Sequence, residues 1–261
     1  MRYTEAPARR AELLHRVAEA GYLSSVDAAE QFGVSDMTIR RDLRELAAQG
    51  LVRRVAGGAS VLVPPTGTPF EQRRTAAAAE KAAVARAAVG LLDDAGVVAL
   101  DAGTAVAALA TLLPGGLTVV THSEPVLLTC TEREDLDLIA LGGTYSRPTR
   151  SFTGPLTRAG LSELAVDVAV LSATAASATG VYCANASDAE TKRAMAAIAK
   201  RVVLLLDHGK LGEHAPMRIL DLAALDTVIV DAGASEPELT MLRAHCRHVL
   251  VAPVSAAESP G

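Results

Sequence analysis

Short apolar runs that alternate with helical stretches constrain the fold of this chain more than any other feature. The apolar runs occupy residues 97–100, 117–121, 136–141, 166–171, 202–206, 227–230 and 249–251. The residue pattern predicts helices over residues 75–93, 104–113, 155–163, 187–200 and 236–245. Strands that alternate with helices of this length are typical of a parallel sheet with helices on both faces. We therefore expect an α/β domain over residues 75–261.

The N-terminal part has a different pattern, in which short helices follow one another between glycines. A first amphipathic helix ends at Gly21. A second helix over residues 26–32 has Ser25 as its predicted N-cap and Gly33 as its stop. A third helix, over residues 36–49, has Ser35 as its predicted N-cap and Gly50 at its C-terminal boundary. Two helices joined by a short turn that contains glycine indicate a helix-turn-helix.

A β-hairpin is predicted directly after the third helix. Residues 51–55 and 59–63 are apolar or alternating, and Gly57 and Gly58 form the turn between them. A hairpin in this position is the wing of a winged helix-turn-helix, which we assign to residues 1–63. Prolines and a glycine follow, so residues 64–74 are predicted to be an extended polar linker.

The charge pattern points to a local contact with DNA. The formal net charge of the chain is −5, so the protein as a whole does not resemble a basic DNA-coating protein. Arginines nevertheless gather in the third helix and the wing, where they can pair with guanine or with a phosphate. The alternative is a solvated helix face with pairs such as Arg41–Glu45. The residues predicted to bind DNA are Ser35, Thr38, Arg40, Arg41, Arg44, Arg53 and Arg54.

Composition narrows the remaining classes of protein. The chain has three cysteines, none of them in a C-x-x-C pair, which argues against a disulfide framework and a zinc site. No metal or cofactor is expected. The sequence has no segment typical of a signal peptide or a membrane span, and we expect a cytoplasmic protein.

Three loops in the larger domain carry residues that suit an anionic ligand. Residues 101–105 (DAGTA), residues 121–125 (THSEP) and Gly142-Gly143-Thr144 each follow an apolar run. Because the carboxyl ends of parallel strands meet at one edge of the sheet, we expect these loops to share a crevice. Each loop alone is more often a tight turn than a ligand site.

Lysine is rare in this chain, and two lysines fall near these loops. Lys210 follows the apolar run 202–206, and Lys192 lies in the helix predicted over 187–200. Each lysine is either a solvated surface residue or a point charge for a phosphate group.

Many of these segments resemble the DeoR-type regulators. The resemblance covers residues 10–59, with SDMTIRRDLREL (35–46) and GLVRRVAGGA (50–59), and continues through DAGT (101–104), VTHS (120–123), LGG (141–143), SFTGP (151–155) and DHGK (207–210). It implies a C-terminal sensor domain that is similar in fold to ribose-5-phosphate isomerases and coenzyme A transferases and that binds phosphorylated metabolites. The effector-binding residues that it implies are Asp101, Gly103, Thr104, Ser123, Gly142, Gly143 and Lys210.

The resemblance implies a transcription regulator, expected to repress carbohydrate or related catabolic genes until a phosphorylated metabolite binds. Its expected partners are an operator in double-stranded DNA and this effector, and it is expected to act as a homodimer or homotetramer. The alternative is an isomerase-like enzyme with a fused DNA-binding domain. We expect no enzyme, because residues 173–176 (ATAA) lack the acidic candidates that proton abstraction needs.

Overall fold

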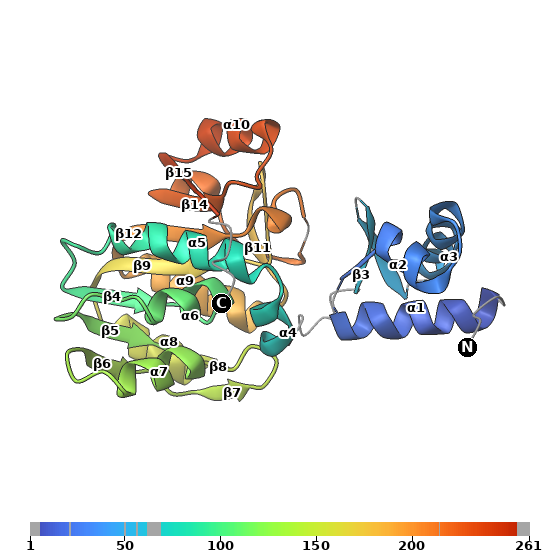
Figure 1. Ribbon diagram of the computed structural model, residues 1–261. Coiled ribbons are helices and arrows are strands. Elements are labelled where there is room, and N and C mark those ends of the chain that lie inside the picture. Colours follow the sequence, from blue (N-terminus) through green and yellow to red (C-terminus); the bar gives the residue numbers. More distant parts are fainter. Residues whose placement is uncertain are drawn as a thin grey trace, which may run out of the picture. The chain divides into compact units, whose positions relative to one another are not determined.

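The computed structural model describes residues 6–20, 22–49, 51–55, 57–61, 69–213 and 215–254. The chain divides into two compact units, Met1–Pro64 and Pro65–Gly261, and each is described by itself. Figure 1 shows the elements of both units along the chain.

The N-terminal unit is a winged helix-turn-helix. Its elements are α1 (Ala6–Ala20), β1 (Tyr22–Ser24), α2 (Ser25–Phe32), α3 (Asp36–Ala48), β2 (Val52–Val55) and β3 (Gly58–Val61). The hairpin strands β2 and β3 pair antiparallel, and β1 adds to the outer side of β3. Leu13, Val17, Ile39, Leu43 and Leu46 are buried between the helices and this small sheet.

The caps of the two central helices follow the sequence with one correction. The N-cap of α2 is Ser24, whose Oγ accepts from the Asp27 N–H at 3.4 Å, and not Ser25, which is buried in the first turn. Gly33 ends α2 with a φ of 64°, a conformation that glycine adopts without strain. Ser35 caps α3 as predicted, its Oγ accepting from the Thr38 N–H at 3.2 Å.

The C-terminal unit is built on a seven-stranded sheet in which every neighbouring pair is parallel. The strand order is β15-β14-β12-β9-β4-β5-β6. The strands are β4 (Val97–Leu100), β5 (Thr118–Thr121), β6 (Asp137–Ala140), β9 (Val166–Ser172), β12 (Ala199–Leu206), β14 (Thr227–Asp231) and β15 (His248–Ala252). All seven predicted apolar runs are therefore strands of one sheet.

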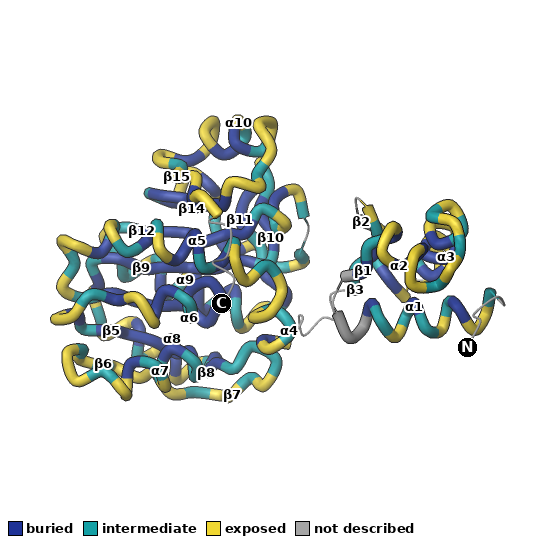
Figure 2. Tube along the Cα trace, viewed as in Figure 1, coloured by how far each residue is buried: buried dark blue, intermediate teal, exposed yellow. Residues whose placement is uncertain are grey.

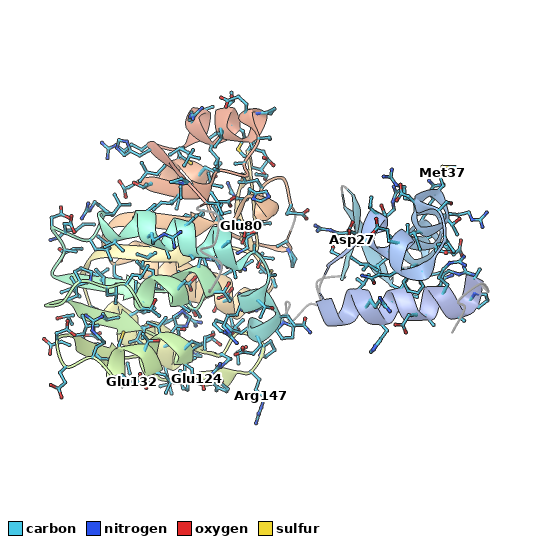
Figure 3. The ribbon with its side chains drawn as sticks, viewed as in Figure 1. Asp27, Met37, Glu80, Glu124, Glu132 and Arg147 are labelled. Carbon is cyan, nitrogen blue, oxygen red and sulfur yellow. The ribbon has the colours of Figure 1, made fainter. Side chains whose placement is uncertain are left out.

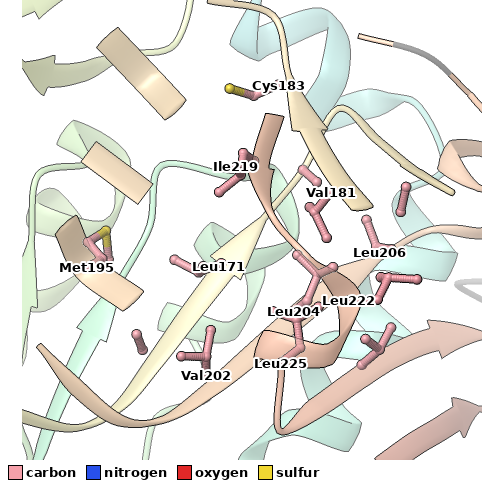
Figure 4. Packing of buried hydrophobic residues seen from close by; sticks show 14 of the residues in the cluster. Leu171, Val181, Cys183, Met195, Val202, Leu204, Leu206, Ile219, Leu222 and Leu225 are labelled. Atoms are coloured by element: carbon pink, nitrogen blue, oxygen red, sulfur yellow. The ribbon is translucent and has the colours of Figure 1, made fainter. Parts of the chain in front are cut away.

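Helices cover both faces of this sheet, as predicted. One face carries α5 (Ala78–Val89), α6 (Thr104–Ala110) and α7 (Glu124–Thr131), and the other carries α8 (Pro155–Ser162), α9 (Ala186–Ala197) and α10 (Glu236–His245). Successive residues of a strand join different cores: Val203 and Leu205 pack with α5 and α6, whereas Leu204 and Leu206 belong to the cluster in Figure 4. Figure 2 shows the central strands buried, in contrast to the exposed edge strand β6.

The unit also contains smaller elements that the sequence did not predict. They are α4 (Phe70–Thr75), the hairpin β7 (Thr144–Ser146) with β8 (Ser151–Thr153), the sheet β10 (Ala175–Ser177), β11 (Gly180–Cys183) and β13 (Met217–Leu220), and the 3-10 turns η1 (His208–Lys210) and η2 (Leu222–Ala224). Helix α4 lies in the predicted linker, but Phe70 is buried in the C-terminal unit, so this part of the linker is folded. Among the described helices, none has the length and apolar character needed to cross a membrane.

Candidate DNA-binding surface and effector site

One face of α3 presents arginines to solvent. Arg40, Arg41 and Arg44 are exposed, and Arg44 lies one helical turn after the first two, whereas Ile39 and Leu43 on the opposite face are buried. Met37 is on the exposed face too, 80% accessible, and Figure 3 shows it projecting from the helix. The surface is therefore one cationic helix face that is not used by the core.

The arginines of this face have only weak intramolecular partners. Arg40 Nε lies 2.8 Å from Asp36 Oδ2 on the same helix, and both side chains are more than a third exposed. An exposed pair of this kind contributes at most about 1 kcal/mol and is easily exchanged for a phosphate. Glu45, the suggested partner of Arg41, instead accepts from Gln49 Nε2 at 3.0 Å.

The wing lies beside the start of this face. Arg40 and Arg54 line a shallow depression together with Ser25, Leu43, Gly57 and Gly58. Arg54 is exposed and Arg53, the neighbouring residue of β2, is half-buried. Ser35 is exposed, and Thr38 is half-buried with its Oγ1 2.9 Å from Ser35 Oγ. The residues predicted to bind DNA thus belong to α3, its cap and the adjoining strand.

The effector residues predicted from the sequence do not form one small pocket. The loops with Lys210 and Gly142 follow β12 and β6, which are four strand spacings apart in the sheet order. At about 4.8 Å for each spacing these loops are about 19 Å apart, more than a sugar phosphate spans. The strand order reverses between β4 and β9, so the crevice expected of such sheets lies at Asp101 and Ser172.

Asp101 occupies this crevice but has no room for a ligand hydroxyl. It is fully buried, and Oδ2 accepts from the Ser172 N–H at 2.9 Å, from Ser172 Oγ at 2.6 Å and from Lys192 Nζ. His122 Nε2 lies 3.3 Å from Oδ1. The prediction that Asp101 binds ligand hydroxyls is not supported by this geometry, because its lone pairs are already used inside the protein.

Lys192 is the buried partner of Asp101 and not a surface residue. Its side chain also lies 3.5 Å from Asp188 Oδ1. Burial disfavours the charge of Lys192, but the Asp101 and Asp188 carboxylates outweigh this effect and raise its pKa. Burial likewise opposes ionisation of Asp101, yet the charge of Lys192 and the contact with His122 hold its pKa well below the usual range. The pair is therefore charged and holds α9 to the carboxyl end of β4.

Four more predicted residues have structural reasons for their identity. Ser123 is buried and caps α7. A Cβ on Gly103 would lie 2.2 Å from Ser172 Oγ, so only glycine fits between β4 and β9. Gly143 has a φ of 153°, and a Cβ there would lie 2.2 Å from Thr157 Oγ1. The carbonyl of Gly142 accepts from the same Thr157 hydroxyl at 2.8 Å.

Thr104 differs from these residues because its hydroxyl is buried without a hydrogen-bond partner among the described residues. The residue is 5% exposed and lines a cavity of about 350 Å³ between α4, α5, α6 and α7. Ala107, Ala108 and Phe70 also line the cavity. The charged residues that line it are all cationic: Arg74, Lys81 and Arg150.

Lys81 is the most buried of these cations. Its ammonium donates to the backbone carbonyls of Arg73 and Ala76, at the C-terminal end of α4. Burial lowers the pKa of Lys81 to about 8, and repulsion from Lys210 adds to this effect, whereas Asp207 opposes it. Lys210 Nζ lies 3.2 Å from Asp207 Oδ2, so this carboxylate offsets much of the positive charge that Lys210 brings near Lys81. The structure brings Thr104, Lys81 and Lys210 to one side of the sheet.

The sequence pattern assigns no role to Lys81, Arg73 or Ser172. The spacing of Lys81 one turn into a helix that follows a polar segment is a weak signal by itself. Arg73 was assigned to a linker, because prolines precede it. Only the fold shows that these residues meet the carboxyl edge of the sheet.

Comparison with known proteins places both units in one family. Residues 9–64 match the DeoR-like helix-turn-helix domain, and residues 76–232 match the DeoR C terminal sensor domain. The uncharacterized HTH-type transcriptional regulator YgbI of Escherichia coli is 34% identical over 87% of this chain and 91% of its own. The glycerol-3-phosphate regulon repressor of Escherichia coli is 29% identical over 89% of this chain and 94% of its own.

Among solved structures, a D-ribose-5-phosphate isomerase in complex with phospho-erythronic acid matches with a TM-score of 0.38 and 19% identity. The match covers 50% of this chain and 52% of that one, and a similarity of this size carries no implication for activity. The two matched domains and the full-length relatives confirm the family predicted from the sequence: the chain belongs to the DeoR family of DNA-binding transcriptional regulators.

Proposed function

We propose that this protein is a cytoplasmic repressor of carbohydrate or related catabolic genes that leaves its operator when a phosphorylated small molecule binds the C-terminal unit. The arginine face of α3 and the wing residues Arg53 and Arg54 contact the operator. The observation that carries the effector part is the cavity beside Thr104 and Lys81.

The chemistry of this cavity favours a phosphate group. A buried hydroxyl without a partner is costly, and a ligand oxygen would satisfy Thr104. The Lys81 ammonium supplies positive charge, and no carboxylate is among the described residues that line the cavity. The cavity volume of about 350 Å³ lies within the usual range of ligand pockets and is enough for a small sugar phosphate.

The alternative of an isomerase is less well supported. A general base must present a free lone pair to the substrate. Asp101, the acidic candidate at the crevice, is buried and paired with Lys192, Ser172 and His122. We therefore propose a regulator without catalytic activity, which a spectrophotometric isomerase assay on the purified protein tests directly.

We further propose a homodimer or homotetramer as the DNA-binding species. A single winged helix-turn-helix reads a short half-site, so useful specificity needs two copies on one operator. Light scattering of the protein with its DNA distinguishes this from a monomer on one half-site.

The decisive experiment is a gel-shift assay on the DNA upstream of the protein's own gene, repeated with inorganic phosphate and a panel of sugar phosphates. We expect at least one phosphorylated compound to weaken binding about 5-fold to 150-fold, the usual range of allosteric coupling. Thr104→Val, which removes the hydroxyl and keeps the shape, should reduce this response. The same sugars without a phosphate group serve as controls, and a response to these controls alone would contradict the proposed ligand class.

A further inference from the structure

Helix α4 lies between two small spaces that differ in their charge. On one side is the cavity with Lys81 and Thr104. On the other side Arg73 lines a space of about 20 Å³ at the crevice between β4 and β9, together with Ser172, Asp188 and Lys192. That volume holds about one water molecule, so the protein's own side chains fill the crevice and leave no room there for a ligand.

Arg73 completes the charge balance of the crevice. Asp101 and Asp188 are two carboxylates, and Lys192 is the ammonium between them. Burial lowers the pKa of Arg73, but both carboxylates oppose the shift because they lie close to the guanidinium. With Lys192 alone, the buried Asp101 and the partly buried Asp188 would leave one negative charge without a counter-charge, which is unfavourable at a site of low exposure. The guanidinium therefore holds α4 against the end of the sheet.

The two ends of α4 are tied to the same unit. At the N-terminal end Phe70 is buried and its N–H donates to the Pro148 carbonyl at 2.8 Å. At the C-terminal end the Lys81 ammonium donates hydrogen bonds to the carbonyls of Arg73 and Ala76. Lys81 is thus bonded to α4 and also faces the proposed effector cavity.

We propose that α4 is a strap whose hold on the sensor domain is set by Arg73 and Lys81, and that an anion bound at Lys81 loosens it. This inference rests on the proposed function for the location of the anion. A bound phosphate competes with the two α4 carbonyls for the same ammonium, and the anion is the stronger acceptor. Because α4 directly follows the segment that leads from the DNA-binding unit, the state of the strap reaches that unit through the chain itself.

The test compares Arg73→Gln with Arg147→Gln in the full-length protein. Arg147 is exposed and projects away from the fold in Figure 3, which makes it a matched control for the loss of one arginine. Hydrogen exchange of the α4 amides and affinity for the upstream DNA are measured with and without inorganic phosphate. Thermal shift measures phosphate binding.

In the parent and in Arg147→Gln, phosphate should speed exchange of the α4 amides and change DNA affinity together. In Arg73→Gln the α4 amides should exchange fast without phosphate, DNA affinity should differ from the parent about 5-fold or more, and phosphate should still bind but add little. Parent-like exchange in Arg73→Gln, or a parent-like phosphate response of its DNA affinity, would overturn the strap.

Failure of the effector site gives a different result. If phosphate and the sugar phosphates produce no thermal shift in the parent, the proposed cavity is wrong and the part of the inference that involves Lys81 is wrong with it. The role of Arg73 is then still decided by exchange and DNA affinity of Arg73→Gln without ligand.

Discussion

The exposed face of α3 and the carboxyl edge of the sensor sheet place their charged residues in opposite ways. In the DNA-binding unit the arginines of α3 are exposed and weakly paired, whereas at the carboxyl edge of the sensor sheet Asp101 and Lys192 are buried and bonded to each other. An exposed cation on a helix face is available to an external polyanion. A buried pair is used by the fold itself, as Arg9 and Asp42 also are inside the DNA-binding unit. The same residue types therefore serve recognition on the surface of α3 and stability at the buried edge of the sensor sheet.

The largest effect should come from breaking the buried pair. Lys192→Met leaves the Asp101 carboxylate buried without its main counter-charge and should lower the free energy of unfolding by about 3–5 kcal/mol. Lys200→Met is the matched control, because Lys200 pairs with Asp167 on the surface and its side chain is 78% exposed; it should cost about 0–1 kcal/mol. Urea unfolding followed by circular dichroism measures both. Equal costs would mean that Asp101–Lys192 does not hold the fold.

The second prediction concerns the exposed arginines. Changing Arg40, Arg41 and Arg44 to Ala should remove DNA binding while the melting temperature stays within a few degrees of the parent. Each residue that reads a base should cost about 1–3 kcal/mol of affinity, and each lost phosphate contact should flatten the salt dependence. Gel shifts at several salt concentrations, with Arg86→Ala on α5 as a control, provide the measurement. Parent-like affinity in the triple variant would exclude this face.

The smallest effect concerns Lys81, which is intermediate between the exposed arginines of α3 and the buried Asp101–Lys192 pair. Lys81 is a buried cation whose pKa is lowered to about 8. The charged form attracts the anion, so affinity for inorganic phosphate should be highest below pH 8 and fall as the pH rises through this value. If binding needs the ammonium, the fall from pH 7 to pH 9 is about tenfold, as expected for one titrating group. Calorimetry at both pH values measures it. Lys81→Arg, which stays charged, should bind phosphate with little dependence on pH; an equal fall in this variant would assign the effect to another group.

Local patterns in the sequence predicted most of the fold. Apolar runs with helices between them predicted all seven parallel strands, Ser35 predicted the start of α3 and Gly33 predicted the end of α2. Gly50, the predicted boundary after α3, lies outside the described residues. The choice between Ser24 and Ser25 was missed because both are good caps, and only burial of Ser25 in the helical bundle separates them.

The candidate site was less predictable, because it depends on which strands are neighbours. Loops that each suit an anion were treated as one crevice, although the strand order places Lys210 and Gly142 far apart. The glycines at 103 and 143 are needed where side chains of Ser172 and Thr157 approach, contacts that span long stretches of sequence. Likewise, a pair such as Asp101 and Lys192 leaves no local pattern, since its partners are 91 positions apart.

The strand order also determines when the sheet can be completed during synthesis of the chain. Strand β4 is an interior strand of the sheet, yet one of its neighbours, β9, is made much later: Ser172 follows Asp101 by 71 positions. At 5–20 residues per second this leaves β4 with an open edge for roughly 4–14 s on the ribosome. The N-terminal unit, whose contacts are closer in sequence, can close in that interval. During synthesis, an unfinished sheet with one exposed apolar edge is therefore the species most exposed to aggregation and to chaperones.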